Sequence, residues 1–84
     1  MNPKPPLSPF SESARSIIVG WYRHYRGGRY EVIGLGRHSE SLEEVVVCRR
    51  EGAEEFWVRP VSNWLEQVEC EGKTVPRFVQ EKFL

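Results

Sequence analysis

Short runs of β-branched and aromatic residues, each followed by a turn signal, restrict the fold of this chain more than any other feature of its sequence. The clearest run is Glu44–Arg50, which contains three consecutive valines. The glycine pair Gly27 and Gly28 can adopt the positive φ angles that a hairpin turn requires. We predict strands over residues 20–25, 30–35, 44–50, 56–59, 65–70 and 74–75. Strands this short and this regularly interrupted indicate an all-β domain.

The number and length of these strands favour a small barrel. About five strands in a module of this size can close on themselves, and closure removes exposed strand edges. The segment Pro60–Trp64 predicts one tight helical turn, and its sequence resembles the signature that precedes the last core strand of SH3 domains. We therefore expect an SH3-like barrel. An OB-like barrel is the alternative, but it normally needs a helix, and no segment here has a long helical period.

Prolines concentrate at the start of the chain, where four of the first nine residues are proline. Such composition favours an extended polyproline conformation over packing. We therefore expect a flexible Pro-rich arm over residues 1–16, the barrel domain over residues 17–79 and a tail over residues 80–84. The arm contains two overlapping Pro-x-x-Pro motifs, which an SH3-like groove could bind, although such segments are usually solvated linkers.

The formal charge of the chain is zero, because twelve acidic residues balance twelve basic ones. This balance excludes a uniformly basic nucleic-acid binder. The charges are nevertheless uneven: the first 42 residues carry a net +3 and the remaining 42 a net −3. Four arginines and both histidines fall between Gly20 and Ser39. The sequence therefore has a local basic stretch on a neutral chain.

Five basic and aromatic side chains form the binding site that we predict: Arg23, Arg37, His38, Trp57 and Arg59. Arginine suits bidentate contacts to phosphate or carboxylate, and an aromatic ring can stack on a nucleic-acid base. The set predicts a non-enzymatic binding module for an anionic ligand such as RNA or single-stranded DNA. In the alternative interpretation, the aromatic residues Tyr22, Trp57 and Trp64 are core. The arginines then pair with Glu31, Glu40 and Glu44.

Two other functions are weighed against this one. A protein-interaction module would use exposed aromatic residues and the acidic second half of the chain. A hydrolase would use His38 and Glu40, but His38 and Ser39 point to opposite sides of an extended segment. The Gly-x-Ser-x-Gly nucleophile motif does not occur in the sequence. We therefore predict no catalytic residue and no cofactor.

Cysteine and histidine usage points to a reducing compartment and away from a metal site. The two cysteines and two histidines are separated by 13, 9 and 21 residues, so no close pair can nucleate a zinc site. No secretory signal pattern or long apolar run is present in the sequence. We expect a cytoplasmic protein with free thiols, no membrane contact, and a monomeric or weakly homodimeric state.

Several separated blocks carry a longer resemblance to known proteins. They are Gly20-x-Tyr22-Arg23-His24-Tyr25-x-Gly27-Gly28-x-Tyr30-x-Val32-x-Gly34, Arg37-His38-Ser39-Glu40, Glu44-x-Val46-Val47, Trp57-Val58-Arg59-Pro60 and Val68-Glu69-x-x-Gly72-Lys73-Thr74-Val75-Pro76-Arg77-Phe78. In these blocks the chain resembles DUF1653, a small and mostly bacterial family of unknown function. The resemblance implies the small β fold and a cytoplasmic setting, and it brings no established activity.

The chain departs from the pattern of this family in two places. Residues 48–55 form a shorter segment than the family usually has there. A phenylalanine that usually stands near Trp64 is missing. No role therefore carries over to the 48–55 loop.

Overall fold

A computed structural model describes residues 8–82, and the statements below concern these residues. The chain is mostly β, with two helices of one turn each. In chain order the elements are α1 (Glu12–Arg15), β1 (Gly20–His24), β2 (Arg29–Arg37), β3 (Glu44–Arg50), β4 (Trp57–Pro60), α2 (Val61–Trp64), β5 (Gln67–Cys70), β6 (Lys73–Pro76) and β7 (Phe78–Gln80). The helical turn predicted within residues 60–64 is α2.

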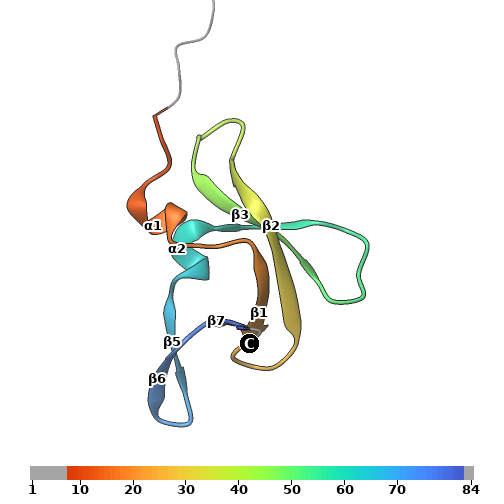
Figure 1. Ribbon diagram of the computed structural model, residues 1–84. Helices are drawn as coiled ribbons and strands as arrows, with labels where there is room; N and C mark the ends of the chain where they lie inside the picture. The colour runs from red at the N-terminus through yellow and green to blue at the C-terminus, as the bar shows by residue number, and fades with distance from the viewer. Residues whose placement is uncertain (1–7, 83–84) are drawn as a thin grey trace, which may run out of the picture.

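The strands form two antiparallel sheets (Figure 1). Five of them lie in the order β4-β3-β2-β1-β7, while β5 and β6 form a separate hairpin. In Figure 1 this hairpin extends from the lower left of the molecule. The edge strands β4 and β7 do not pair with each other within the described residues. The sheets are therefore open, and the closed barrel expected from the sequence is not formed by these strands.

The predicted strand over residues 65–70 does not join the large sheet. Its residues 67–70 pair only with β6, where Val68 lies opposite Val75. The last strand of the large sheet is β7, which lies beyond residues 74–75, the last strand predicted from the sequence. β7 pairs with β1, so that His24 lies opposite Phe78 and Tyr22 opposite Gln80. The large sheet is thus completed by the last described strand of the chain.

A β-bulge in β2 sets which side chains face the core. The register between β2 and β3 shifts between Val32 and Gly34, which leaves Ile33 without a direct partner. Because one extra residue reverses the alternation of side chains, both Val32 and Leu35 lie on the core side. The face that carries Val32, Tyr22 and Phe78 is called the inner face below. Ile33 lies exposed.

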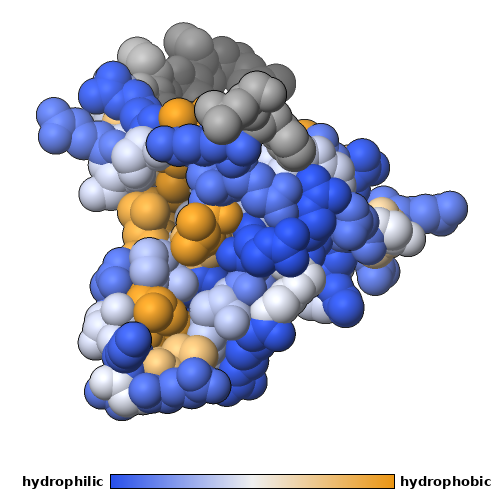
Figure 2. Space-filling view, turned by 60° about the horizontal axis from the view of Figure 1, so that its bottom comes forward, coloured by the Kyte–Doolittle hydropathy of each residue, from blue (hydrophilic) through white to orange (hydrophobic). Residues whose placement is uncertain are grey.

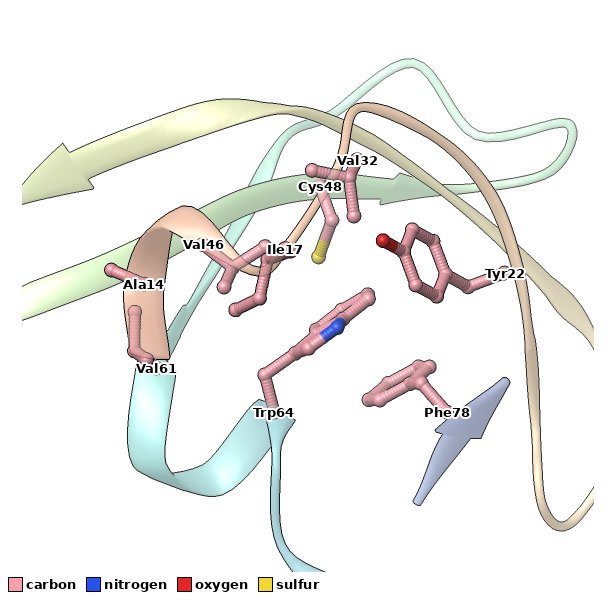
Figure 3. Close-up of a cluster of buried hydrophobic side chains, with 9 residues drawn as sticks. All are labelled: Ala14, Ile17, Tyr22, Val32, Val46, Cys48, Val61, Trp64 and Phe78. Carbon is pink, nitrogen blue, oxygen red and sulfur yellow. The ribbon is translucent and has the colours of Figure 1, made fainter. Parts of the chain in front are cut away.

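The core is centred on Trp64 (Figure 3). Its indole stacks on the Phe78 ring with centroids 3.7 Å apart and meets the Tyr22 ring edge-on at 5.2 Å. Val46 and Cys48 of β3 are fully buried beside it, and burial raises the pKa of the Cys48 thiol. The Tyr22 hydroxyl donates to the Ile18 carbonyl and accepts from the Ile18 amide. One aromatic cluster therefore joins β1, α2 and β7.

Residues of the N-terminal segment that precede residue 17 pack on the domain. The sequence predicts a flexible arm over residues 1–16, of which residues 1–7, including much of the Pro-x-x-Pro motifs, lie outside the described residues. Ala14 of α1 is fully buried, and Phe10 packs against the core. Ser11 caps α1, and its amide and hydroxyl both donate to the Glu44 carboxylate, each at 2.7 Å. Ser11 and Glu44 thereby attach α1 to the start of β3.

Loss of the Glu44 carboxylate should release α1 from the sheet. The hydrogen bonds from the Ser11 hydroxyl and amide hold the pKa of Glu44 below its ordinary value. A lowered folded-state pKa means that this stabilisation is present above about pH 4.3 and is lost as the pH falls through the folded-state value. We expect Glu44→Ala to reduce amide-exchange protection in α1 at neutral pH, as measured by NMR. Glu43→Ala is the control, and unchanged protection in Glu44→Ala would contradict the prediction.

No helix among the described residues is long and apolar enough to cross a membrane.

Candidate functional site

Arg23 and Arg37 of the predicted binding site lie at opposite ends of the large sheet. Arg23 is opposite Arg29 at one end of β2, and Arg37 lies at the other end of β2. Nine extended residues separate these ends by about 26 Å. Arg23 also lies on the outer face, because it alternates with the buried Tyr22. Figure 1 places the β1–β2 turn near the bottom of the view and the loop after β2 near the top.

Arg37 and His38 contact the N-terminal segment and their own loop. The Arg37 guanidinium lies over the Phe10 ring at 4.6 Å and donates to the Ser8 carbonyl. The Nδ1 of His38 accepts from the amides of Glu40 and Ser41, at 3.1 and 3.2 Å. These contacts organise the 38–43 loop. They leave Nε2 as the ring nitrogen available for the hydrolase chemistry considered above.

Arg59 and Trp57 share the inner face of β4. Arg59 lies opposite the buried Val46, and Trp57 opposite the buried Cys48. The Arg59 guanidinium extends over the rings of Phe78 and Tyr30, at 5.2 and 5.9 Å, and donates to the Asn63 side chain at 3.0 Å. Trp57 is 47% exposed. The structure therefore brings these two predicted residues together and separates them from Arg23, Arg37 and His38.

Arginines on the outer face are paired with glutamates. Glu81 contacts both Arg23, at 3.2 Å, and Arg29, at 3.0 Å. Arg29 also pairs with Glu51, and its guanidinium lies 4.4 Å from the Trp21 ring centroid. Arg49 pairs with Glu31 across β2 and β3 at 3.0 Å. Of the three glutamates that the alternative interpretation names, Glu31 forms one of these pairs, whereas the other pairs use Glu81 and Glu51.

The inner face carries a different arrangement, which we call the basic–aromatic rim. The rim consists of His24, Tyr25, Arg26, Tyr30, Arg50 and Arg59. The His24 ring lies 4.7 Å from Tyr25 and 5.9 Å from Tyr30, and the Arg26 guanidinium lies 5.4 Å from Tyr25. Arg50 is directly opposite Tyr30 in the β2–β3 register and therefore shares its face. Within residues 8–82, Arg26, Arg50 and Arg59 form no salt bridge.

The electrostatic environment of His24 reflects this clustering of cations. Burial, together with the positive charges of Arg59, Arg77 and Arg26, lowers the pKa of His24. Its Nδ1 accepts a hydrogen bond from the Arg26 amide at 3.1 Å, which is compatible only with an unprotonated Nδ1. His24 is therefore neutral at pH 7, with its proton on Nε2.

We expect His24 to titrate below the ordinary histidine value in an NMR pH titration of its imidazole. Its contribution to stability is complete above about pH 6.5 and is lost as the pH falls through the lower folded-state pKa. Arg59→Gln should raise the pKa of His24, because the largest of the three cationic influences is removed while burial of the ring persists. An unchanged His24 titration in this variant would show that the charge of Arg59 does not influence His24.

A groove adjoins the rim beside β7. Its volume is about 470 Å³, and it lies between the edge of the large sheet and the β5–β6 hairpin. Val75, Pro76 and Val79 supply apolar walls, while His24 and Arg23 stand at its polar end. Figure 2 shows apolar side chains in an interrupted band on the left of the view, the side on which the hairpin lies in Figure 1. The rim and the groove share His24 and Tyr25.

The described residues contain no group of three or more His, Cys, Asp or Glu side chains that could hold a metal ion.

The predicted binding site contains only Arg59 of the six rim residues, for an identifiable reason. The predicted set does not include His24, Tyr25, Arg26, Tyr30 or Arg50. Alternation along the strands gives the shared face of His24 and Tyr22. The position of that face beside Phe78 depends on the β1–β7 pairing, which joins segments more than 50 residues apart. No local pattern in the sequence predicts this pairing.

Known proteins resemble this chain over the whole of its large sheet. The family model described as a protein of unknown function, DUF1653, matches residues 20–80. The chain belongs to the DUF1653 family. A crystal structure of a DUF1653 protein from Bordetella bronchiseptica is 32% identical to it, with a TM-score of 0.75 over 84% of this chain and 95% of that chain. No curated protein is significantly similar. The DUF1653 match spans all seven strands and the entire rim, and α1 precedes it.

Proposed function

We propose that this DUF1653 chain is a non-enzymatic module that binds single-stranded nucleic acid at the basic–aromatic rim. One observation carries the proposal. Arginines on the outer face pair with glutamates, whereas Arg26, Arg50 and Arg59 have no carboxylate partner within residues 8–82. The guanidinium groups of Arg26 and Arg59 lie over aromatic rings, and Arg50 stands opposite Tyr30 in the strand register. An arginine that already pairs with a glutamate must break that ion pair before it can bind a phosphate. An arginine without a carboxylate partner binds phosphate without this cost.

The rim offers the two kinds of contact that single strands require. Guanidinium groups bind the phosphate backbone, and exposed rings stack on bases for about 1–3 kcal/mol each. Trp57 is the most exposed ring on this face and lies diagonally from Arg50 across β3 and β4. The neutral His24 can donate from Nε2 to a base or a phosphate oxygen. The apolar groove beside His24 could hold an adjacent base.

The test is a fluorescence anisotropy titration with short labelled RNA and DNA single strands at two salt concentrations. The double variant Arg26→Gln/Arg50→Gln should weaken binding at least about tenfold and reduce the salt slope by about 1.4, since two phosphate contacts are lost. Arg29→Gln/Arg49→Gln makes the same change in net charge on the outer face, away from the groove, and is the control. We expect it to weaken binding by less than about threefold, through the long-range field alone.

Trp57→Ala separates nucleic acid from a simple anion. Loss of a stacking ring should weaken binding of the single strands by about 5- to 150-fold and leave binding of inorganic phosphate unchanged. Equal effects of the two double variants, or no binding by the wild-type protein at low salt, would overturn the proposal. A response to inorganic phosphate alone would identify a small-anion module instead.

Finer features of the fold and setting belong to the same proposal. We infer that the large sheet is an open form of an SH3-like barrel preceded by a Pro-rich arm. The strand order β4-β3-β2-β1-β7 and the one-turn helix α2 after β4 support the barrel. Both cysteines are free, which supports a reducing, cytoplasmic setting. Similarity to a Bordetella protein supports a bacterial source.

A further inference from the structure

We propose that two copies of this chain associate by antiparallel pairing of their β4 strands, which extends the five-stranded sheet across a two-fold axis. β4 is an edge of the large sheet, so its outer backbone groups have no strand partner within residues 8–82. An unpaired edge is a template for another strand. The inference is independent of the nucleic-acid proposal, because it rests on the free edge and the outer side chains of β4.

The side chains along this edge are apolar and exposed. Phe56 is 61% and Val58 64% exposed, which are the largest values among the exposed hydrophobic residues of the described chain together with that of Val19. Val58 lies opposite Val47 on the outer face, and Phe56 precedes it by two residues. The exposed Ile33 lies two strands further in. Phe56, Trp57 and Val58 thus form a continuous run of exposed apolar residues at this edge.

The other edge of the large sheet, β7, is less available for pairing with a second copy. β7 has three residues, against four in β4. The residue before β7, Arg77, is held by Glu66: its amide donates to the Glu66 carbonyl at 3.0 Å, and its guanidinium pairs with the Glu66 carboxylate at 2.8 Å. The β5–β6 hairpin therefore stands beside that edge. A second copy is expected at β4.

Pairing about Val58 is self-complementary. If Val58 lies opposite its own copy, antiparallel register places Trp57 opposite Arg59 of the second copy, and Phe56 opposite Pro60. The acidic residues Glu54 and Glu55 precede β4, so in this register they approach the end of the partner strand that carries Arg59. A chain of zero net charge adds no overall repulsion between copies.

The end of β4 and the two-fold symmetry limit the assembly to two copies. Pro60 ends β4 and has no amide hydrogen to donate to a longer ladder. A two-fold contact uses one edge of each copy and closes on itself, so it does not build fibres. An interface this short lies at the weak end of protein–protein contacts, and we expect a dissociation constant on the order of 100 μM.

Sedimentation velocity across a concentration series tests the pairing. The average mass of the wild-type protein should rise toward that of a dimer as its concentration approaches about 1 mM, well above the expected dissociation constant. Val58→Lys should remain monomeric, because a charge on the two-fold axis repels its own copy. Ile33→Lys places the same charge on the same face but away from the edge, and it should dimerise like the wild-type protein.

A cysteine cross-link tests the register. In a Cys70→Ser background, Val58→Cys should form a disulfide-linked dimer under mild oxidation, since the two-fold axis brings the new thiols together. Val79→Cys places an exposed thiol on the opposite edge and should not cross-link at the same rate. A wild-type protein that is monomeric throughout the series, or equal behaviour of Val58→Lys and the wild type, would overturn the inference.

Discussion

Trp64→Ala should lower the free energy of unfolding by about 3–5 kcal/mol, the range typical of a buried aromatic side chain replaced by alanine. Trp64 is 3% exposed and lies between the rings of Tyr22 and Phe78. Its loss leaves a cavity that three separate elements border, so collapse of one element cannot fill it. A small domain has only about 5–15 kcal/mol of stability. The variant should therefore be partly unfolded in moderate urea concentrations that leave the wild-type protein folded.

Urea denaturation followed by circular dichroism measures this effect. Trp57→Ala is a control with identical chemistry, because Trp57 is largely exposed on an edge strand. We expect the control to change the unfolding free energy by less than about 1 kcal/mol. Similar midpoints for the two variants would mean that Trp64 is not the centre of the core.

Phe78→Ala should destabilise the chain by a similar amount, about 3–5 kcal/mol, and should also disturb the rim. The Phe78 ring stacks on Trp64, meets His24 at 5.0 Å and Tyr30 at 5.4 Å, and lies beneath Arg59. Removal of the ring admits water beside His24 and frees the Arg59 guanidinium. Because burial is the largest cause of the lowered pKa of His24, that pKa should rise in the variant.

Val79→Ala is the matched control, one residue along β7 on the opposite, exposed face. It should change the stability by less than about 0.5 kcal/mol and leave the His24 titration unchanged. The double variant Trp64→Ala/Phe78→Ala should lose less stability than the sum of the losses in the two single variants, since each ring is the other's partner. Strict additivity would contradict the stacked arrangement.

Local patterns in the sequence predict the individual elements of this fold well. The valine run of β3, the glycine turn after β1 and the short helix α2 each follow from residue types within a few positions. Long-range pairing was less accessible. The sequence indicated that residues 65–70 form a core strand, yet they form the separate hairpin, because β7 occupies the free side of β1.

The candidate site divides in the same way. Trp57 and Arg59 could be selected from residue type and strand alternation alone, and the structure places both on the inner face. Arg23 and Arg37 have equally suitable chemistry, but Arg23 lies on the outer face, and the two residues are at opposite ends of β2. The bulge at Ile33 adds to the difficulty, because it reverses the faces of all later β2 residues. A single sequence does not reveal which strand takes that extra residue.

The pairing of β1 with β7 has a consequence for synthesis of the chain. β1, β2 and β3 are neighbours in sequence as well as in the sheet, and they can associate as soon as they leave the ribosome. β1 meets its second partner only after Gln80 has emerged, so the nascent domain exposes Tyr22 and the Trp64 ring until then. During that interval the incomplete sheet ends in the five-residue strand β1 instead of the three-residue strand β7, and chaperones that bind unpaired strands have their main opportunity then.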